Sequence, residues 1–241
     1  MLHQIVRYSA VVPLIEELGS GTVLDVGSGS DGVASWLGPG WTTTAVDRSF
    51  DVPGAMRGPH GGSARMLPGD ARALPFADRE FDAVLALDVM EHIPPEYRGE
   101  ALGELVRVAG RRLIVAGPAG EAALRADREL AAGLRERGVT PPSWIVEHEA
   151  NGFPEPAELL GALEAHGRAR LAGSENLRWH TWLFSFEFRR PGSHFSRAAS
   201  EALVRWLARG GVARALGRVG LRIVQGPRRG PHYRTVAILD R

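Results

Sequence analysis

The sequence predicts an α/β protein with a mostly parallel β-sheet and helices on both faces of that sheet. Short apolar segments, each long enough for one strand, alternate with segments of helical pattern. A glycine-rich turn directly follows the first apolar segment, and aspartates follow several of the others. In a parallel sheet, such turns and acids gather at the carboxyl edge, where ligands of α/β proteins bind.

The predicted strands are β-branched or apolar runs bounded by turn residues. They cover residues 22–25, 42–47, 64–67, 81–87, 112–116, 168–171 and 233–239. The predicted helices are an amino-terminal segment broken or kinked at Pro13, a helix opened by Val33, Ala34 and Leu37, and segments 95–108, 121–137, 156–166 and 197–216. Residues 50–63 and 138–154 contain glycine or proline and are predicted loops.

Composition excludes several kinds of protein. The chain of 241 residues has the length of one α/β domain, and its net charge of +1 indicates neither a nucleic-acid nor a membrane partner. The absence of cysteine excludes a disulfide, a thiol nucleophile and a cysteine-ligated metal. No apolar run is long enough to span a bilayer, and the amino terminus lacks the apolar core of a signal peptide. We therefore expect a soluble, cytoplasmic protein.

The glycine turn carries the first functional signal. Gly27, Gly29 and Gly32 have the spacing G-x-G-x-x-G, and Asp47 follows Gly27 by about 20 residues, where dinucleotide-binding proteins place a ribose-binding acid. This spacing alone is compatible with an NAD-dependent oxidoreductase. However, the carboxylate of Asp25 would repel a pyrophosphate at the mouth of the turn, whereas a cationic or zwitterionic ligand would be attracted.

Residues 22–37 (TVLDVGSGSDGVASWL) resemble motif I of the class I S-adenosylmethionine-dependent methyltransferases, which reads acid, any residue, then G-x-G-x-G. One departure is Asp31, which stands where the third glycine belongs, with Gly32 next. The resemblance implies a Rossmann-like sheet of seven strands whose last strand is antiparallel. It also implies one methyltransferase domain over residues 1–241, with a cofactor-binding core at 20–118, a helical and aromatic substrate-covering region at 119–232 and a closing strand at 233–240.

The same resemblance assigns the cofactor contacts. Asp47 would bind both ribose hydroxyls, while Asp70, followed by the Ala71 N–H, would bind the adenine. Arg48 would either stack on the adenine or face water. The segment from Leu87 to Pro94 resembles the part that small-molecule methyltransferases place against the methionine moiety and methyl group. The predicted set is Asp25, Gly27, Ser28, Gly29, Asp47, Arg48, Gly69, Asp70, Ala71, Leu87, Asp88 and His92.

Two histidines are candidate catalytic residues because imidazole titrates near neutral pH. His92 would act as a general base or substrate contact, although the sequence slightly favours a role in fixing the loop before Pro94. His148 lies between Glu147 and Glu149, and a neighbouring carboxylate would hold its ring in one tautomer. Solvated charge on a loop explains this segment equally well. One histidine between sequential acids has poor ligand geometry, so the sequence predicts no metal site.

The substrate is predicted to be a small molecule with an oxygen, nitrogen or carbon nucleophile, and the sequence does not indicate an oligomeric state. Residues 140–195 are predicted to cover the pocket. The alternatives are an RNA methyltransferase, an NAD-dependent oxidoreductase and a non-catalytic partner protein. Only an arginine-rich helix supports RNA binding, and a solvated helix face explains it better; its arginines are Arg205, Arg209, Arg214 and Arg218. The aromatic residues that form either core or substrate cover are Trp179, Trp182, Phe184, Phe186 and Phe188.

Overall fold

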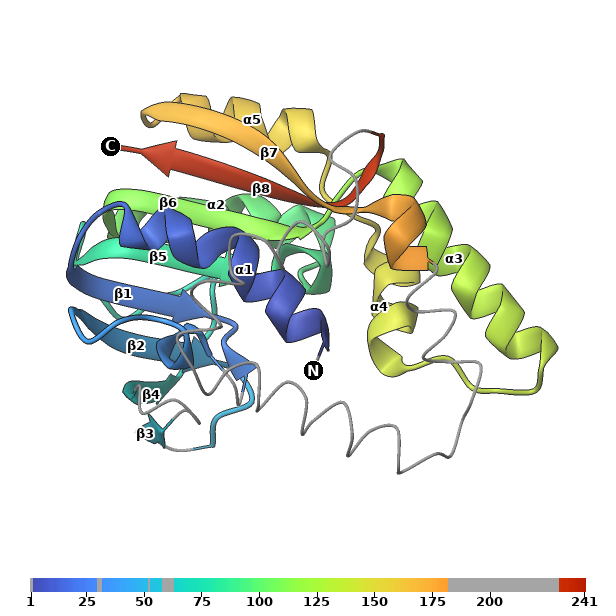
Figure 1. Ribbon diagram of the computed structural model, residues 1–241, viewed down its shortest axis with the longest axis horizontal. Coiled ribbons are helices and arrows are strands. Elements are labelled where there is room, and N and C mark those ends of the chain that lie inside the picture. The colour runs from blue at the N-terminus through green and yellow to red at the C-terminus, as the bar shows by residue number, and fades with distance from the viewer. Residues whose placement is uncertain (1, 30–31, 52, 58–62, 182–229) are drawn as a thin grey trace.

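The structure, a computed structural model, describes residues 2–29, 32–51, 53–57, 63–181 and 230–241 (Figure 1). Its strands form one mixed sheet of eight, in the order β3-β4-β2-β1-β5-β6-β8-β7. The strands are β1 (Gly21–Val26), β2 (Trp41–Asp47), β3 (Gly54–Arg57), β4 (Ser63–Pro68), β5 (Phe81–Leu87), β6 (Ala109–Pro118), β7 (Arg168–Asn176) and β8 (His232–Asp240).

The predicted topology is confirmed, with one strand added. Strands β4, β2, β1, β5 and β6 pair in parallel, and β8 lies antiparallel between β6 and β7. The additional strand, β3, pairs antiparallel with β4 at the sheet edge, inside the predicted loop 50–63. The loop prediction was wrong there because an edge strand needs only backbone pairing on one side and no continuous apolar run.

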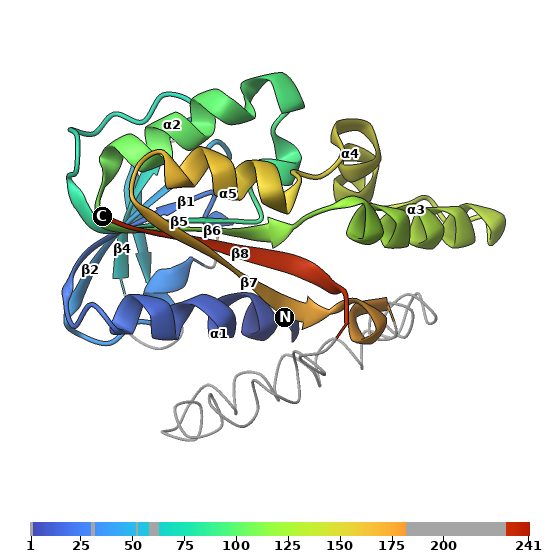
Figure 2. The ribbon, with the colours of Figure 1, turned by 90° about the horizontal axis from the view of Figure 1, so that it is seen from above.

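Helices cover both faces of the sheet (Figure 2). Helices α2 and α5 lie on one face, and α1 lies on the other. The α-helices before β7 are α1 (Leu2–Glu16), α2 (Arg98–Val108), α3 (Glu121–Glu136), α4 (Ser143–Asn151) and α5 (Pro156–Glu164), and the 3₁₀ turns are η2 (Val33–Ser35), η3 (Met90–His92) and η4 (Pro95–Tyr97). A further helical segment at 177–181 follows β7.

The pleat of β5 connects the two halves of the core. Val84 packs with Leu105 of α2, whereas the next residue, Leu85, faces the opposite side and packs in the cluster that contains Val11 of α1. All four side chains are completely buried. Successive strand residues point to opposite faces, so this single apolar strand supports both helical layers. Burial of each side chain of this size stabilises the fold by about 1.5–3 kcal/mol.

Helix α1 continues through Pro13 to Glu16, so the helix is not broken at Pro13. Two other local predictions were wrong. The helix expected after the glycine turn is only the 3₁₀ turn η2, because Gly38, Pro39 and Gly40 stop it before β2. Helix α4 occupies most of the predicted loop 138–154. The helix expected at 197–216, with its four arginines, and the aromatic residues from Trp182 to Phe188 lie outside the described residues.

Helices α3 and α4 extend beyond the carboxyl ends of the parallel strands (Figures 1 and 2). The chain reaches them directly from β6, whose last residue, Pro118, is followed by α3 at Glu121. This arrangement brings the carboxyl-terminal half of the chain to the edge where the strand-end acids lie. None of the described helices is long and apolar enough to cross a membrane.

Candidate active site

The turn after β1 has the backbone that its glycines predict. Gly27 and Gly29 have φ angles of 69° and 58°, in the left-handed region that favours glycine. A Cβ atom on Gly27 would lie 2.4 Å from Cγ2 of Val89, whereas no atom of the described structure lies within 4 Å of a Cβ on Gly29. Among the described residues, the turn is therefore closed at Gly27 and open at Gly29. Residue 31, the departure from the motif, lies outside the described residues.

Two aspartates hold this turn. Asp25, which is 1% exposed, accepts a hydrogen bond of 2.6 Å from the Val33 N–H. Asp47, at the end of β2, accepts one of 2.8 Å from the Gly29 N–H. The hydroxyl of the buried Ser28 donates to the Gly29 carbonyl. The predicted cofactor residues at the ends of β1 and β2 are thus brought together.

The two aspartates differ in electrostatics. Burial raises the pKa of Asp25 to about 6, although the Val33 N–H and the charge of Arg7 oppose the change. Burial also raises the pKa of Asp47, but hydrogen bonds from Ser49 and Gly29 outweigh it and hold that pKa below its ordinary value. Ser49 donates two hydrogen bonds to Oδ1, whereas Oδ2 has only the Gly29 N–H as a described donor. Oδ2 therefore keeps a lone pair for a ligand hydroxyl.

Asp70 lies beside Asp47, because Asp47 pairs with Pro68 in the β2–β4 ladder and the Gly69 N–H donates to the Asp47 carbonyl. Both carboxylate oxygens of Asp70 accept hydrogen bonds from Arg72, which lowers the pKa of Asp70 to about 2. An adenine amine would therefore share this carboxylate with Arg72 or displace it. The next residue, Ala71, is buried. Arg48 is mostly exposed, with its Nε 4.0 Å from Asp70.

At the end of β5, Leu87 is buried and Asp88 adopts a φ of 54°. The Asp88 carboxylate forms ion pairs with Arg7 of α1, at 3.3 Å, and with Arg234 of β8. Arg7 also donates to the Leu87 carbonyl. Sequence reasoning missed both arginines, because they come from the two ends of the chain and belong to no recognisable motif.

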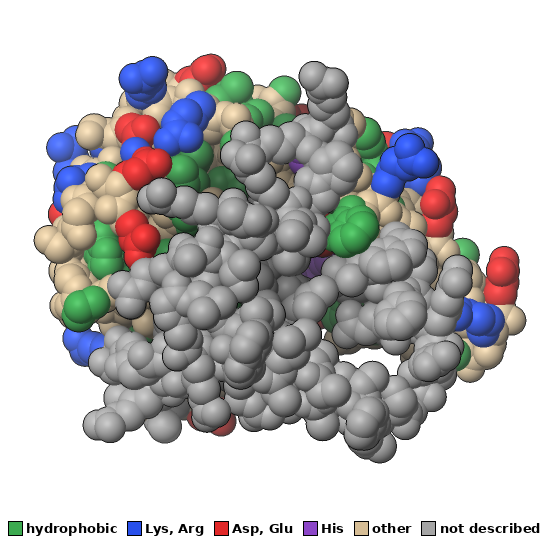
Figure 3. All heavy atoms as spheres, viewed as in Figure 1, with side chains coloured by type: hydrophobic (Ala, Val, Ile, Leu, Met, Phe, Trp, Pro, Cys, Tyr) green, Lys and Arg blue, Asp and Glu red, His purple; other side chains and the backbone are tan. Residues whose placement is uncertain are grey.

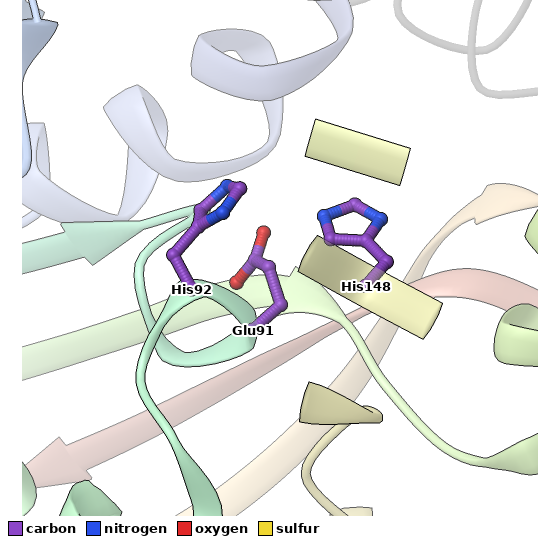
Figure 4. A group of neighbouring side chains, drawn as sticks. All are labelled: Glu91, His92 and His148. Carbon is purple, nitrogen blue, oxygen red and sulfur yellow. The ribbon is translucent and has the colours of Figure 1, made fainter. Parts of the chain in front are cut away.

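The turn η3 after Asp88 brings both candidate catalytic histidines together with a buried acid. The Glu91 carboxylate lies between the imidazole rings of His92 and His148 (Figure 4). The two ring centroids are 5.2 Å apart. A ligand atom from each of the three side chains lies within 4.8 Å of the others. We call Glu91, His92 and His148 the Glu91 cluster.

His148 is oriented from behind by a buried acid that sequence reasoning also missed. Its Nδ1 lies 2.6 Å from Oδ2 of Asp127 in α3, and the Tyr233 hydroxyl of β8 donates to the same carboxylate. This carboxylate, rather than a flanking glutamate, fixes the tautomer of His148. The neighbouring acids point elsewhere because helix α4 turns by about 100° per residue. Glu147 contacts His92, and Glu149 pairs with Arg135.

The interior of the cluster has unsatisfied polar atoms. Nε2 of His148 and Oε2 of Glu91 are buried and have no hydrogen-bond partner among the described residues. Burial raises the pKa of Glu91 to about 8. Burial also lowers the pKa of His92, although the hydrogen bond to Glu147 opposes the change. Buried polar groups without partners are rare in folded proteins and often occur where a protein binds or reacts with something.

Arg98 ties the two halves of the cluster together. Its guanidinium donates to the carbonyls of Met90 and Ile93, beside η3, and to those of Asn151 and Gly152, at the end of α4. The Asn151 amide also donates to the Glu91 carbonyl. These bonds connect the turn that carries Glu91 and His92 to the helix that carries His148.

We expect the Arg98→Met substitution to lower stability measurably. Methionine preserves most of the aliphatic stem but removes the charged donors to four carbonyls. Hydrogen bonds of charged groups contribute ~1.5–3 kcal/mol, and a loss of ~2 kcal/mol lowers the Tm of a chain of this length by ~4–8 °C. Arg128→Met removes an exposed pair with Glu121 and should change stability by less than about 0.5 kcal/mol. Equal Tm values for the two variants would refute the connecting role of Arg98.

The strand order, the glycine turn and the acids at the ends of β1, β2 and β4 agree with the Rossmann-like sheet that the sequence predicts. Residues 24–112 match the family described as a methyltransferase domain. This segment runs from β1 into β6 and includes the glycine turn, Asp47 and Asp70. A comparison with curated proteins finds no match.

Several solved structures are similar to the chain. The PH0226 protein from Pyrococcus horikoshii OT3 is 26% identical, with 54% of this chain and 62% of that chain covered and a TM-score of 0.40. The magnesium protoporphyrin IX methyltransferase of Synechocystis PCC 6803 is 20% identical, with 70% and 76% covered and a TM-score of 0.48. The 1,6-didemethyltoxoflavin-N1-methyltransferase of Burkholderia thailandensis is 18% identical, with 72% and 71% covered and a TM-score of 0.45.

The residues at the carboxyl edge fit the cofactor chemically. None of the described residues comes within 4 Å of a Cβ on Gly29, which leaves room among them for a ligand close to the backbone of the turn. The unshared lone pair of Asp47 suits a ribose hydroxyl, and the carboxylate of Asp25 suits the positive charges of a sulfonium and an amino group. Arg7 lies at the same edge, where its charge pairs with Asp88.

Proposed function

We propose that this chain is a class I S-adenosylmethionine-dependent methyltransferase and that it transfers the methyl group to a hydroxyl group of a small molecule held at the Glu91 cluster. The observation that carries the proposal is the buried Nε2 of His148, which lies beside the carboxyl edge of the sheet and has no hydrogen-bond partner among the described residues. A methyl acceptor that must lose a proton requires a base, and a hydroxyl needs one far more than a neutral amine does. A nitrogen or carbon acceptor is the alternative to be tested.

The cofactor would be held by residues of the first half of the chain. Asp47 binds the ribose, the Asp70–Ala71 segment binds the adenine, and Asp25 attracts the methionine end through its negative charge. When bound, S-adenosylmethionine would supply the electrophilic methyl carbon, and its sulfur would take the carbon–sulfur electron pair as the acceptor oxygen bonds to that carbon. The chain contributes mainly alignment, because fixed geometry removes much of the entropic barrier of a reaction between two bound molecules.

The acceptor would be activated by His148. Its Nε2 accepts the hydroxyl proton, and Asp127 stabilises the resulting imidazolium through Nδ1, as in other histidine–carboxylate pairs. His92 contacts the acceptor from the other side of Glu91. Helices α3 and α4 cover this edge and belong to the proposed substrate-covering region, 119–232, of a single domain. Closure over the substrate excludes water from the reacting groups.

A small-molecule acceptor agrees with the surface. On the face shown in Figure 3, the acidic and arginine side chains of the described residues are intermixed around the periphery. Nucleic-acid-binding surfaces instead gather basic side chains in one patch or stripe. The visible part of the described surface therefore offers no support for the RNA alternative.

The proposal is tested by incubating the enzyme with S-adenosylmethionine that carries an isotope-labelled methyl group, in the presence of either a small-molecule cell extract or purified cellular RNA. We expect labelled low-molecular-weight products, with the label attached to oxygen. Label found only in RNA would overturn the substrate class. Labelled N-methyl or C-methyl products would overturn the hydroxyl assignment while preserving the enzyme class.

The raised pKa of Asp25 predicts a pH-dependent affinity. Binding a cation favours the carboxylate, so affinity for S-adenosylmethionine should fall as pH decreases through about 6. At one pH unit below its pKa, a carboxyl is ionised in only ~10% of molecules, so the Kd at pH 5 should be ~10-fold higher than at pH 7. Titration calorimetry measures both values. The Asp25→Asn variant should bind more weakly at pH 7 and lose this slope. A slope that persists in the variant would contradict the role of Asp25.

For the same Asp25→Asn variant, we expect weaker cofactor binding but higher folding stability. The folded pKa of about 6 exceeds the ordinary aspartate pKa of 3.8, so the folded chain binds more protons between these values and becomes less stable as pH rises from 4 to 6. Above pH 6 the ionised, buried carboxylate destabilises the unliganded protein. Asp25→Asn should therefore raise the Tm at pH 7 while weakening cofactor binding. A lower Tm would mean that the Asp25 carboxylate serves the fold.

A further inference from the structure

We infer that the Glu91 cluster binds a divalent first-row transition-metal ion. The cluster offers two imidazoles and one carboxylate, whose ligand atoms lie within 4.8 Å of one another. Ligand atoms at about 2.0–2.2 Å from one tetrahedral ion lie ~3.3–3.6 Å apart, so side-chain rotations that move these atoms by up to about 1 Å complete the site. The sequence predicts no metal here, because the ligands come from η3 and α4, far apart in the chain.

The second observation is the unsatisfied interior of the cluster. Glu91 is 1% exposed and His148 is 4% exposed, and each has a buried polar atom, Oε2 and Nε2, with no partner among the described residues. The Glu91 carboxylate lies between the two imidazole rings (Figure 4). An ion among these three side chains would satisfy both atoms at once.

The surrounding carboxylates orient both rings for coordination. Nδ1 of His148 contacts Asp127, and Nδ1 of His92 contacts Glu147 at 2.7 Å. His148 therefore keeps its buried Nε2 for a ligand in the cluster, and His92 keeps its second ring nitrogen. Metal-binding histidines commonly have this arrangement, in which a carboxylate on the other ring nitrogen fixes the tautomer and raises the basicity of the ligand.

The donor set indicates the kind of ion. Imidazole ligands suit zinc, iron, cobalt and nickel, whereas magnesium and calcium prefer sites built from oxygen atoms. The connection through Arg98 and Asn151 keeps the two ligand-bearing elements in place. Three protein ligands leave at least one position open, as catalytic metal sites do.

The catalytic role of the ion rests on the proposed function. The binding of the ion to the Glu91 cluster does not depend on that function. With the ion bound, Nε2 of His148 is a ligand, and the ion replaces His148 as the group that activates the acceptor. The acceptor oxygen would occupy the open position, where coordination lowers the pKa of the hydroxyl and its proton leaves to solvent water. The oxygen then forms its bond to the methyl carbon as the carbon–sulfur bond breaks. His92 and His148 would hold the ion, and through it the acceptor, with no change in oxidation state.

The test uses untagged full-length protein freed of metal with a chelator and titrated with Co²⁺, whose visible absorption reports its ligands. We expect one equivalent to bind and give ligand-field bands. His148→Asn preserves a donor toward Asp127 but removes Nε2, and Glu91→Gln removes the charged ligand. Each should weaken Co²⁺ binding at least ~100-fold, since loss even of an outer-shell partner typically costs 10–100-fold. His166→Asn, at an exposed histidine, is the matched control and should bind like the wild type.

The outcomes separate this inference from the proposed function. No ligand-field bands at millimolar Co²⁺, or bands that persist in the Glu91→Gln, His148→Asn double variant, would overturn the metal site. Bands lost equally in His166→Asn would also overturn it. Methyl transfer that survives chelation, together with absent Co²⁺ binding, would leave His148 as the base. Tight Co²⁺ binding without any methyl transfer would refute the proposed function and preserve the metal site.

Discussion

The His148→Asn substitution is expected to lower kcat for methyl transfer by at least ~10²-fold, the usual size of a general-base contribution. Asparagine preserves a donor toward Asp127 but removes Nε2, the atom that faces the Glu91 cluster. Affinity for S-adenosylhomocysteine should stay within about twofold, because His148 belongs to the acceptor side and interactions made only in the transition state lower kcat selectively. Steady-state kinetics and calorimetry measure the two effects.

The positioning of His148 has its own control. Asp127→Asn leaves Nε2 in place but favours the wrong tautomer, so kcat should fall and the pH profile of kcat should shift. His166→Asn should leave both unchanged. A His148→Asn enzyme with wild-type kcat would exclude His148 from catalysis. A variant that loses cofactor affinity and kcat together would indicate a structural role instead.

The Asp47→Ala substitution is expected to weaken S-adenosylmethionine binding by roughly 1.5–3 kcal/mol, the range for hydrogen bonds to charged groups. This loss corresponds to a Kd higher by ~10–150-fold. The variant removes the free lone pair of Oδ2 and also the bond to the Gly29 N–H that holds the glycine turn. Both effects act where the cofactor ribose is proposed to bind.

Asp51→Ala is the matched control, because Asp51 is an exposed aspartate shortly after β2. It should bind the cofactor as the wild type does. Thermal unfolding of Asp47→Ala shows whether the substitution also destabilises the whole fold. Unchanged cofactor affinity in Asp47→Ala, or tight binding of NAD by the wild type, would refute the assignment of the ribose to Asp47.

Much of the sheet could be predicted because its signals are local. The run 81–87 is apolar at every position except Asp82, since both faces of the central strand β5 are covered by helices. The cofactor edge was predictable for a related reason. Parallel strands place their carboxyl ends together, so Asp25, Asp47 and Asp70 converge without any long-range information.

The Glu91 cluster could not be predicted in the same way. Glu91 and His92 are neighbours in the sequence, but His148 reaches them only because α4 packs against η3, the turn that follows β5. Asp127 gives no signal on an otherwise ordinary amphipathic helix, and its buried partners come from α4 and β8. Such a cluster depends on tertiary packing, which periodicity and motif spacing do not encode.

A crystal structure of the enzyme with S-adenosylhomocysteine tests the central claim most directly. The ligand should place its ribose hydroxyls on the Asp47 carboxylate and its adenine beside Asp70, with Arg72 turned aside or sharing the carboxylate. Its sulfur should face the Glu91 cluster across a space that admits one acceptor group. A ligand bound elsewhere, or one whose sulfur faces away from His92 and His148, would contradict the account.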